Sequence, residues 1–155
     1  MMPISFNPKG ELNMANSVKT SVNTNGNTMI RLDDVELNWE NVQQPRVDMN
    51  GNRVFDIQMV VSADQAKEAV KVIHNLNPES GKFTARRAVF AGKPKVVDAE
   101  GNMMQERIGN GSRGNIILEK MMSSRGVEFM TLVAVQVTQV VDYDTYKETK
   151  DDFMF

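Results

Sequence analysis

Nine cationic side chains and two phenylalanines, Phe83 and Phe90, are concentrated between residues 82 and 125. The cations are Lys82, Arg86, Arg87, Lys93, Lys95, Arg107, Arg113, Lys120 and Arg125. The same stretch holds four acids, so it carries a net charge of +5 in a chain whose net charge is −2. Single-stranded nucleic acid requires cations for its phosphates and flat side chains on which its bases stack. The segment therefore predicts a nucleic-acid contact surface, and the alternative is an ordinary charged surface spread over several strands.

Two aromatic residues outside this segment are further candidates for stacking on bases. Trp39 is expected at the end of a strand, where partial exposure would allow base contact. Phe55 is in phase with Ile57 and Met59, so we expect it in the core. The glycine-rich run GNGSRGN lacks the spacing of a phosphate-binding loop. It is typical of a tight turn, which would bring Arg107 and Arg113 to the rim of a barrel.

Other chemistry has little material in this chain. There is no cysteine, and His74 is the single histidine, which argues against disulfides, thiolate zinc sites and multi-histidine metal sites. We expect His74 to be exposed or at an edge, and we expect no cofactor, no bound metal and no catalytic residue. The chain also lacks an apolar run near 18 residues, and we expect no membrane span and no signal peptide. One enzymatic alternative is a nuclease that holds magnesium through Asp33, Asp34 and other carboxylates.

Short strands and a single helix must position these side chains. Alternating apolar residues predict strands, with a bulge at Asp33-Asp34, over 28–39, 55–61, 93–99, 113–122 and 127–141. The last strand is expected to form one continuous apolar face from Val127 and Phe129 to Val141. Ser62 and Gln65 form a capping-box pattern that opens a helix over 63–76. An Asn25-Gly26 turn could pair residues near Val18 and Val22 with the following segment.

This pattern predicts a mainly β fold, an OB-like antiparallel barrel of five or six strands with one inserted helix. We divide the chain into a flexible N-terminal arm packed on or beside the barrel (1–27), the OB-like single-stranded DNA-binding domain (28–141) and an acidic tail (142–155). The tail holds five acids and two lysines, and ends in Asp151, Asp152, Phe153, Met154 and Phe155. An acidic segment with aromatic side chains can occupy the protein's own cationic groove, or it can insert a Phe into a basic, apolar pocket of a partner.

Four segments, in this order, resemble the single-stranded DNA-binding proteins of T7-like phages, a helix-destabilising family. They are KPKVVDAEGN (93–102), IGNGS (108–112), VAVQVTQVVDYD (133–144) and DDFMF (151–155). The resemblance covers about residues 54–155. It implies an OB-fold without enzymatic activity that coats and protects single strands in DNA replication, recombination and repair, in the cytoplasm of the bacterial host.

The resemblance also implies partners and contact residues. It implies a homodimer, and a tail that recruits the phage DNA polymerase and primase-helicase. By position, the implied DNA contacts are Arg86, Arg87, Lys93, Lys95, Arg107 and Arg113, and Phe155 is the implied tail anchor. The tail is less acidic than is typical of the family, which weakens autoinhibition more than partner docking. The alternative is an RNA-binding or phage assembly module built on a small β-barrel.

Overall fold

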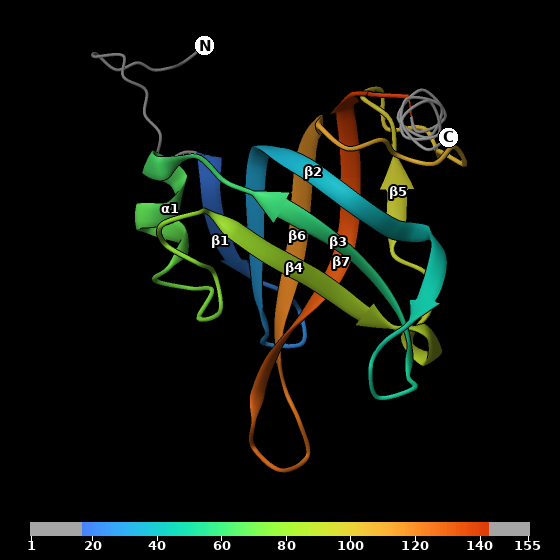
Figure 1. Ribbon diagram of the computed structural model, residues 1–155. Helices are drawn as coiled ribbons and strands as arrows, with labels where there is room; N and C mark the ends of the chain where they lie inside the picture. The colour runs from blue at the N-terminus through green and yellow to red at the C-terminus, as the bar shows by residue number, and fades with distance from the viewer. Residues whose placement is uncertain (1–16, 143–155) are drawn as a thin grey trace.

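The computed structural model describes residues 17–142, and these form a curled sheet of seven strands with one α-helix beside it (Figure 1). The strand order is β4-β3-β2-β6-β7-β5, and β1 pairs with β2. The elements are β1 (Val18–Val22), β2 (Thr28–Val47), β3 (Arg53–Val60), α1 (Ala63–Ala69), β4 (Lys82–Ala88), the 3-10 turn η2 (Val89–Ala91), β5 (Lys95–Val97), β6 (Ser112–Met122) and β7 (Glu128–Gln139).

Strand β2 is long enough to pair with strands in both halves of the curled sheet. Its first half pairs with β6 and its second half pairs with β3, both antiparallel. Three register shifts interrupt its pairing: one at the expected Asp33-Asp34 bulge, one around Trp39, and one between Asn41 and Arg46. Asp34 and Trp39 have φ values of 54° and 53°, in the left-handed region that side chains rarely adopt. The first bulge moves the buried face from Ile30 and Leu32 to the opposite parity, as a one-residue slip must.

The barrel is left partly open between β4 and β7. Strand β4 pairs with β3, whereas β5, the next strand along the chain, pairs in parallel with β7. The OB-like, mainly β fold with one helix is therefore confirmed. The sheet differs from the expected barrel in having seven strands, a parallel pair and no complete closure.

The core confirms most of the period-two pattern. Phe55, Ile57 and Met59 are buried, as expected for β3. The continuous apolar face expected along the last strand is wrong, because the register of β7 against β6 shifts beside Ile117 and Leu118. Beyond that shift Val135 and Val137 are buried, but Val127 and Phe129 before it are exposed, and so is Val141 at the end of the predicted face.

Helix α1 begins as the sequence predicts but ends earlier. Ser62 accepts a hydrogen bond from the Gln65 N–H, and the Gln65 side chain accepts one from Ser62, which completes the capping box. The expected helix over 63–76 is wrong in length. After Ala69 the chain tightens into turns, as the 3.0 Å bond from the Val72 N–H to the Ala69 carbonyl shows. Among residues 17–142, no helix is long and apolar enough to cross a membrane.

Candidate nucleic-acid interface

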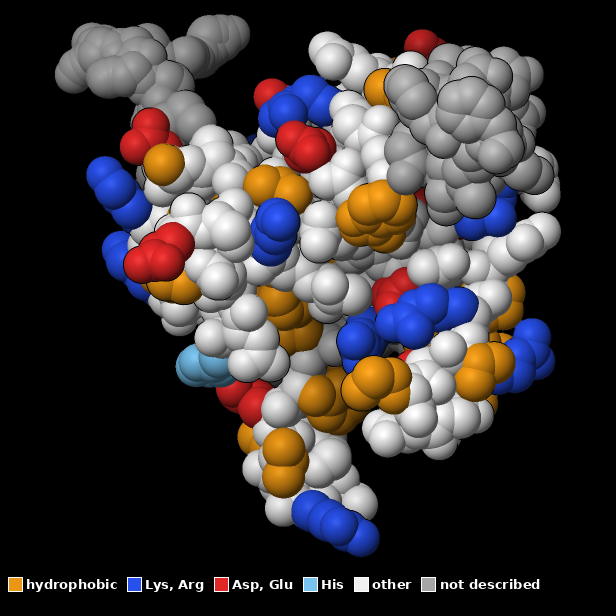
Figure 2. All heavy atoms as spheres, viewed as in Figure 1, with side chains coloured by type: hydrophobic (Ala, Val, Ile, Leu, Met, Phe, Trp, Pro, Cys, Tyr) orange, Lys and Arg blue, Asp and Glu red, His pale blue; other side chains and the backbone are white. Residues whose placement is uncertain are grey.

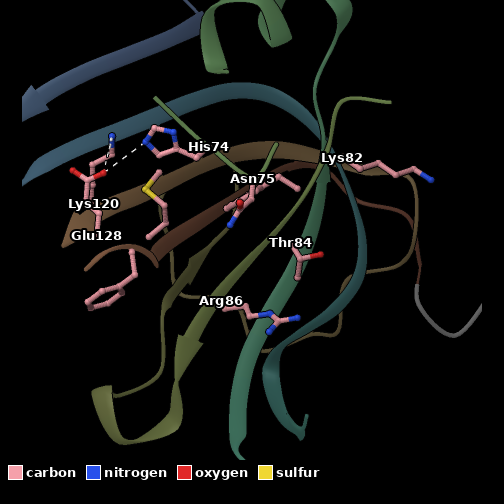
Figure 3. A pocket seen from close by; sticks show the side chains of 10 residues that line it. His74, Asn75, Lys82, Thr84, Arg86, Lys120 and Glu128 are labelled. Carbon is pink, nitrogen blue, oxygen red and sulfur yellow. Dashed lines mark ion pairs between the residues drawn. The ribbon is translucent and has the colours of Figure 1, made fainter. Parts of the chain in front are cut away.

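A groove of about 720 Å³ lies where the barrel is open, between β4 and the end of the β6–β7 hairpin (Figure 3). Its lining combines cationic, aromatic and amide side chains. The lining residues are His74, Asn75, Lys82, Phe83, Thr84, Arg86, Lys120, Glu128, Phe129 and Met130. Figure 2 shows basic and hydrophobic side chains gathered on this side of the molecule, above the projecting hairpin.

Cationic side chains border the groove on two sides. Lys82, Thr84 and Arg86 alternate along β4, so they share its outer face, where all three are exposed and point away from Lys120 and Glu128 (Figure 3). On the other side, Lys120 and His74 lie 3.9 and 3.7 Å from the same oxygen, Oε1 of Glu128 (Figure 3). Among the described residues, Glu128 is the one acid in the lining. The groove is therefore positive around a single, already paired carboxylate.

The outer face of β4 continues across β3 onto β2 as rows of polar side chains. Arg86 lies opposite Asp56 on β3, which in turn lies opposite Asn41 on β2. The buried Asp56 carboxylate accepts bonds from Asn41 and from Arg46, whose Nη2 is 2.6 Å from Oδ2. This hydrogen bond raises the pKa of Arg46 above its ordinary value, so the group stays charged. The face therefore joins the groove to the Trp39 bulge through fixed polar groups.

Trp39 stands at the far end of this face, with 57% of its surface exposed. It was expected at the end of a strand, but β2 continues past it to Val47. Its backbone N–H donates to the Asn110 side chain at 2.7 Å, and the neighbouring Asn38 side chain accepts from the backbone N–H of Gly111. These two hydrogen bonds connect the glycine-rich turn GNGSRGN (109–115) to the bulge at which the indole ring is exposed.

Arg107 fastens the same turn from its other end. Its Nε donates to Oε1 of Glu40 at 2.9 Å, and its Nη2 donates to the Glu40 carbonyl oxygen. The Glu40 carboxylate also accepts the backbone N–H groups of Val42, Gln43 and Ile108. A buried carboxylate with this many donors is stable only as a complete cluster. Arg107 thus contributes to the structure of the loop beside Trp39.

Two other predicted contacts are also bound within the protein. Arg113 donates to the Asp34 side chain and carbonyl oxygen, at 2.8 and 2.7 Å. Arg87 donates to the carbonyl oxygens of Ala91, Gly92 and Leu132. Both guanidinium groups hold irregular backbone in place.

The other predicted contact residues are more widely spread. Lys93 donates to the Gln43 side chain at 2.6 Å, and Phe90 is almost fully exposed beside β4. Lys95 lies with Arg31 at a separate hollow of about 170 Å³, and Arg125 lies in the turn of the β6–β7 hairpin. The structure therefore does not bring all nine cations to one face. The tail residues Asp151, Asp152, Phe153 and Phe155 lie outside the described residues.

Sequence reasoning missed Phe129 as a site residue because its strand was assigned one continuous buried face. The alternation of the strand itself holds no signal for this, because the register shift between Leu132 and Ala134 depends on pairing with β6.

The carboxylates of the nuclease alternative are engaged by cations: Asp33 contacts Lys19 and Arg31, and Asp34 contacts Arg113. Within residues 17–142, no three His, Asp or Glu side chains are grouped as a metal site requires.

No protein-family model matches the sequence, and no curated protein does. The structure is similar to the crystal structure of gp2.5, a single-stranded DNA-binding protein encoded by bacteriophage T7, with a TM-score of 0.56. The match covers 83% of this chain and 96% of that chain, at 11% sequence identity. At this identity the likeness concerns the fold, so the chain shares the OB-like fold of that single-stranded DNA-binding protein.

Proposed function

We propose that this protein binds single-stranded DNA along the groove between β4 and the β6–β7 hairpin, without catalysing a reaction. The observation that carries the proposal is that cationic and aromatic residues border one open groove: Lys82, Arg86, Lys120, Phe83 and Phe129. The fold shared with a single-stranded DNA-binding protein supports the same reading.

Two physical terms would drive binding. Phosphates that meet Lys82, Arg86 and Lys120 release their condensed counterions, which makes the affinity fall as salt rises. Bases that stack on aromatic rings gain about 1–3 kcal/mol each, whatever their identity. Trp39, joined to the groove by the polar face of β2 and β3, is the candidate for a further stacked base. Binding should therefore be strong, salt-dependent and nearly independent of sequence.

A fluorescence titration tests this directly, because Trp39 is the one tryptophan of the chain. The protein is titrated with oligo-dT, with duplex DNA and with single-stranded RNA at several salt concentrations, and a labelled-oligonucleotide assay is run in parallel. We expect tight, salt-sensitive binding to oligo-dT and much weaker binding to the duplex. Preference for RNA would favour the RNA-binding alternative. Absence of binding in both assays at low salt, with residues 142–155 removed, would overturn the proposal and favour an assembly module.

The groove itself is tested with a double variant, Lys82→Ala with Arg86→Ala. For single strands the logarithm of affinity changes with the logarithm of salt by about 0.7 per phosphate contact, so the slope should flatten by about 1.4. Lys67→Ala with Lys71→Ala is the matched control, because it removes the same charge from α1 and the turn that follows it, outside the groove lining. An unchanged slope in the groove variant, or an equal change in the control, would contradict the assigned surface.

The biological setting follows from the same proposal. The protein would coat and protect single strands during phage DNA replication and recombination in the cytoplasm of the bacterial host, as a homodimer. Its acidic segment 142–155 would recruit the phage DNA polymerase and primase-helicase through Phe153 and Phe155. Deleting the segment should abolish capture of these enzymes while DNA affinity stays equal or rises modestly. Loss of DNA binding on deletion would overturn this role for the tail.

A further inference from the structure

Both left-handed residues of β2, Asp34 and Trp39, are bonded to an asparagine of the glycine-rich turn (109–115). The backbone N–H of Asp34 donates to the Asn115 side chain at 2.9 Å. The backbone N–H of Trp39 donates to the Asn110 side chain at 2.7 Å. Left-handed backbone is strained in residues other than glycine, and it persists only where the surrounding structure holds it. The two asparagines therefore help to hold the two bulges.

The two bulges differ in the side chain that they present. Asp34 presents a carboxylate, which accepts a hydrogen bond from Arg113 at 2.8 Å. Trp39 presents an indole ring, 57% exposed, between the partly buried Asn38 and the buried Glu40. A bulge re-aims the side chain that it carries. The direction of the indole ring therefore depends on the backbone that Asn110 holds.

The turn that carries Asn110 is fixed at its base, beside the chain that follows β7 (Figure 1). The hydroxyl group of the buried Ser112 donates to the Gly109 carbonyl oxygen at 2.7 Å and accepts the Val141 backbone N–H at 2.8 Å. The Gly109 N–H donates to the Val141 carbonyl oxygen at 2.9 Å. A Cβ atom at Gly109 would collide with that same oxygen. Asn110 therefore reaches Trp39 from a closely packed support.

We propose that Asn110 is a positioning residue for base stacking, because its hydrogen bond to the Trp39 backbone aims the indole ring at a single strand. The inference rests on the proposed function and deepens it at the Trp39 end of the polar face. Asn110 acts through Trp39 and needs no contact with DNA. A side chain that is already oriented loses less conformational freedom on binding, which raises the affinity.

The hydrogen bond is tested without DNA by near-ultraviolet circular dichroism, whose long-wavelength tryptophan bands report Trp39 alone. Asn110→Ala should weaken these bands. Asn110→Asp keeps an acceptor oxygen and should keep the wild-type spectrum. Asn115→Ala is the matched control, because it removes the corresponding hydrogen bond at Asp34, and it should leave the tryptophan bands unchanged. Unchanged bands in Asn110→Ala, or an equal change in Asn115→Ala, would overturn the positioning role.

The link to stacking is tested with a double-mutant cycle of Trp39→Ala and Asn110→Ala in the full-length chain, titrated with labelled oligo-dT. Trp39→Ala should weaken binding about 5- to 100-fold, the equivalent of one stacked base. Asn110→Ala should weaken it measurably, but by no more than Trp39→Ala does. The double variant should bind like Trp39→Ala, because no ring remains for Asn110 to position.

Two results of this cycle would contradict the inference. If Asn110→Ala weakened binding by the same factor with and without the ring, Asn110 would act on DNA or on the fold independently of Trp39. If Asn110→Ala bound like the wild type although its tryptophan bands changed, the orientation of the ring would not matter for binding. A wild type that does not bind oligo-dT would overturn the proposed function itself, whatever the spectra show.

Discussion

Arg86 and Arg87 are neighbours in sequence, but β4 turns them to opposite faces of the sheet. Arg86 is exposed at the groove, on the face that it shares with Lys82 and Thr84. Arg87 points inward, and its guanidinium group lies 2.7, 2.8 and 3.2 Å from the carbonyl oxygens of Ala91, Gly92 and Leu132. It thereby ties the chain after β4 to strand β7 across the open side of the barrel.

The two arginines should therefore respond differently to substitution by alanine. Hydrogen bonds to charged groups contribute about 1.5–3 kcal/mol, so Arg87→Ala should lower the free energy of unfolding by about 2–3 kcal/mol. Arg86→Ala should change it by less than about 0.5 kcal/mol, as exposed substitutions usually do. In DNA binding Arg86→Ala should have the larger effect of the two. Alone it should flatten the slope of the logarithm of affinity against the logarithm of salt concentration by about 0.7. Urea unfolding and salt-dependent titration measure the two effects, and equal behaviour of the variants would contradict the assignment.

A second prediction concerns the buried Glu40 carboxylate, whose side chain is 1% exposed. Glu40→Gln removes the charge that faces Arg107 and introduces a donor where the carboxylate accepted N–H groups. Breaking a buried pair by changing one partner costs about 3–5 kcal/mol, and urea unfolding should show a loss of this order. Glu106→Gln is the control, because Glu106 is exposed beside Arg107, and it should unfold like the wild type. A loss under about 1 kcal/mol in Glu40→Gln would show that the cluster does not hold the loop.

Local patterns predicted the parts of the fold that depend on short spacing. The Ser62–Gln65 capping box, the Asp33-Asp34 bulge and the buried face of β3 follow from neighbouring residues, and all three were predicted. Strand β4 was missed, because Lys82, Arg86 and Arg87 obscure the alternation of its few apolar residues. The second bulge, at Trp39, was also missed, since it is held by Asn110 from a loop distant in sequence.

The candidate site was less predictable for a similar reason. A count of cations identifies the basic segment, but partners distant in sequence decide what each cation does. Arg107 and Arg113 are bound by Glu40 and Asp34, both on β2, and no spacing within the basic segment reveals this. Phe129 joins the groove because a register shift in β7 turns it outward, and that shift depends on pairing with β6.

The left-handed backbone of Trp39 separates its structural effect from its proposed role in stacking. At φ 53° any side chain with a Cβ is strained by about 1–2 kcal/mol, whereas glycine is not. Trp39→Gly should therefore be more stable than Trp39→Ala by about 1 kcal/mol in urea unfolding. Both variants lack the indole ring, so both should bind oligo-dT more weakly by the same factor, equivalent to about 1–3 kcal/mol for one stacked base. A labelled oligonucleotide measures this affinity. If Trp39→Gly bound as tightly as the wild type while Trp39→Ala did not, binding would depend on the bulge's conformation rather than on the ring.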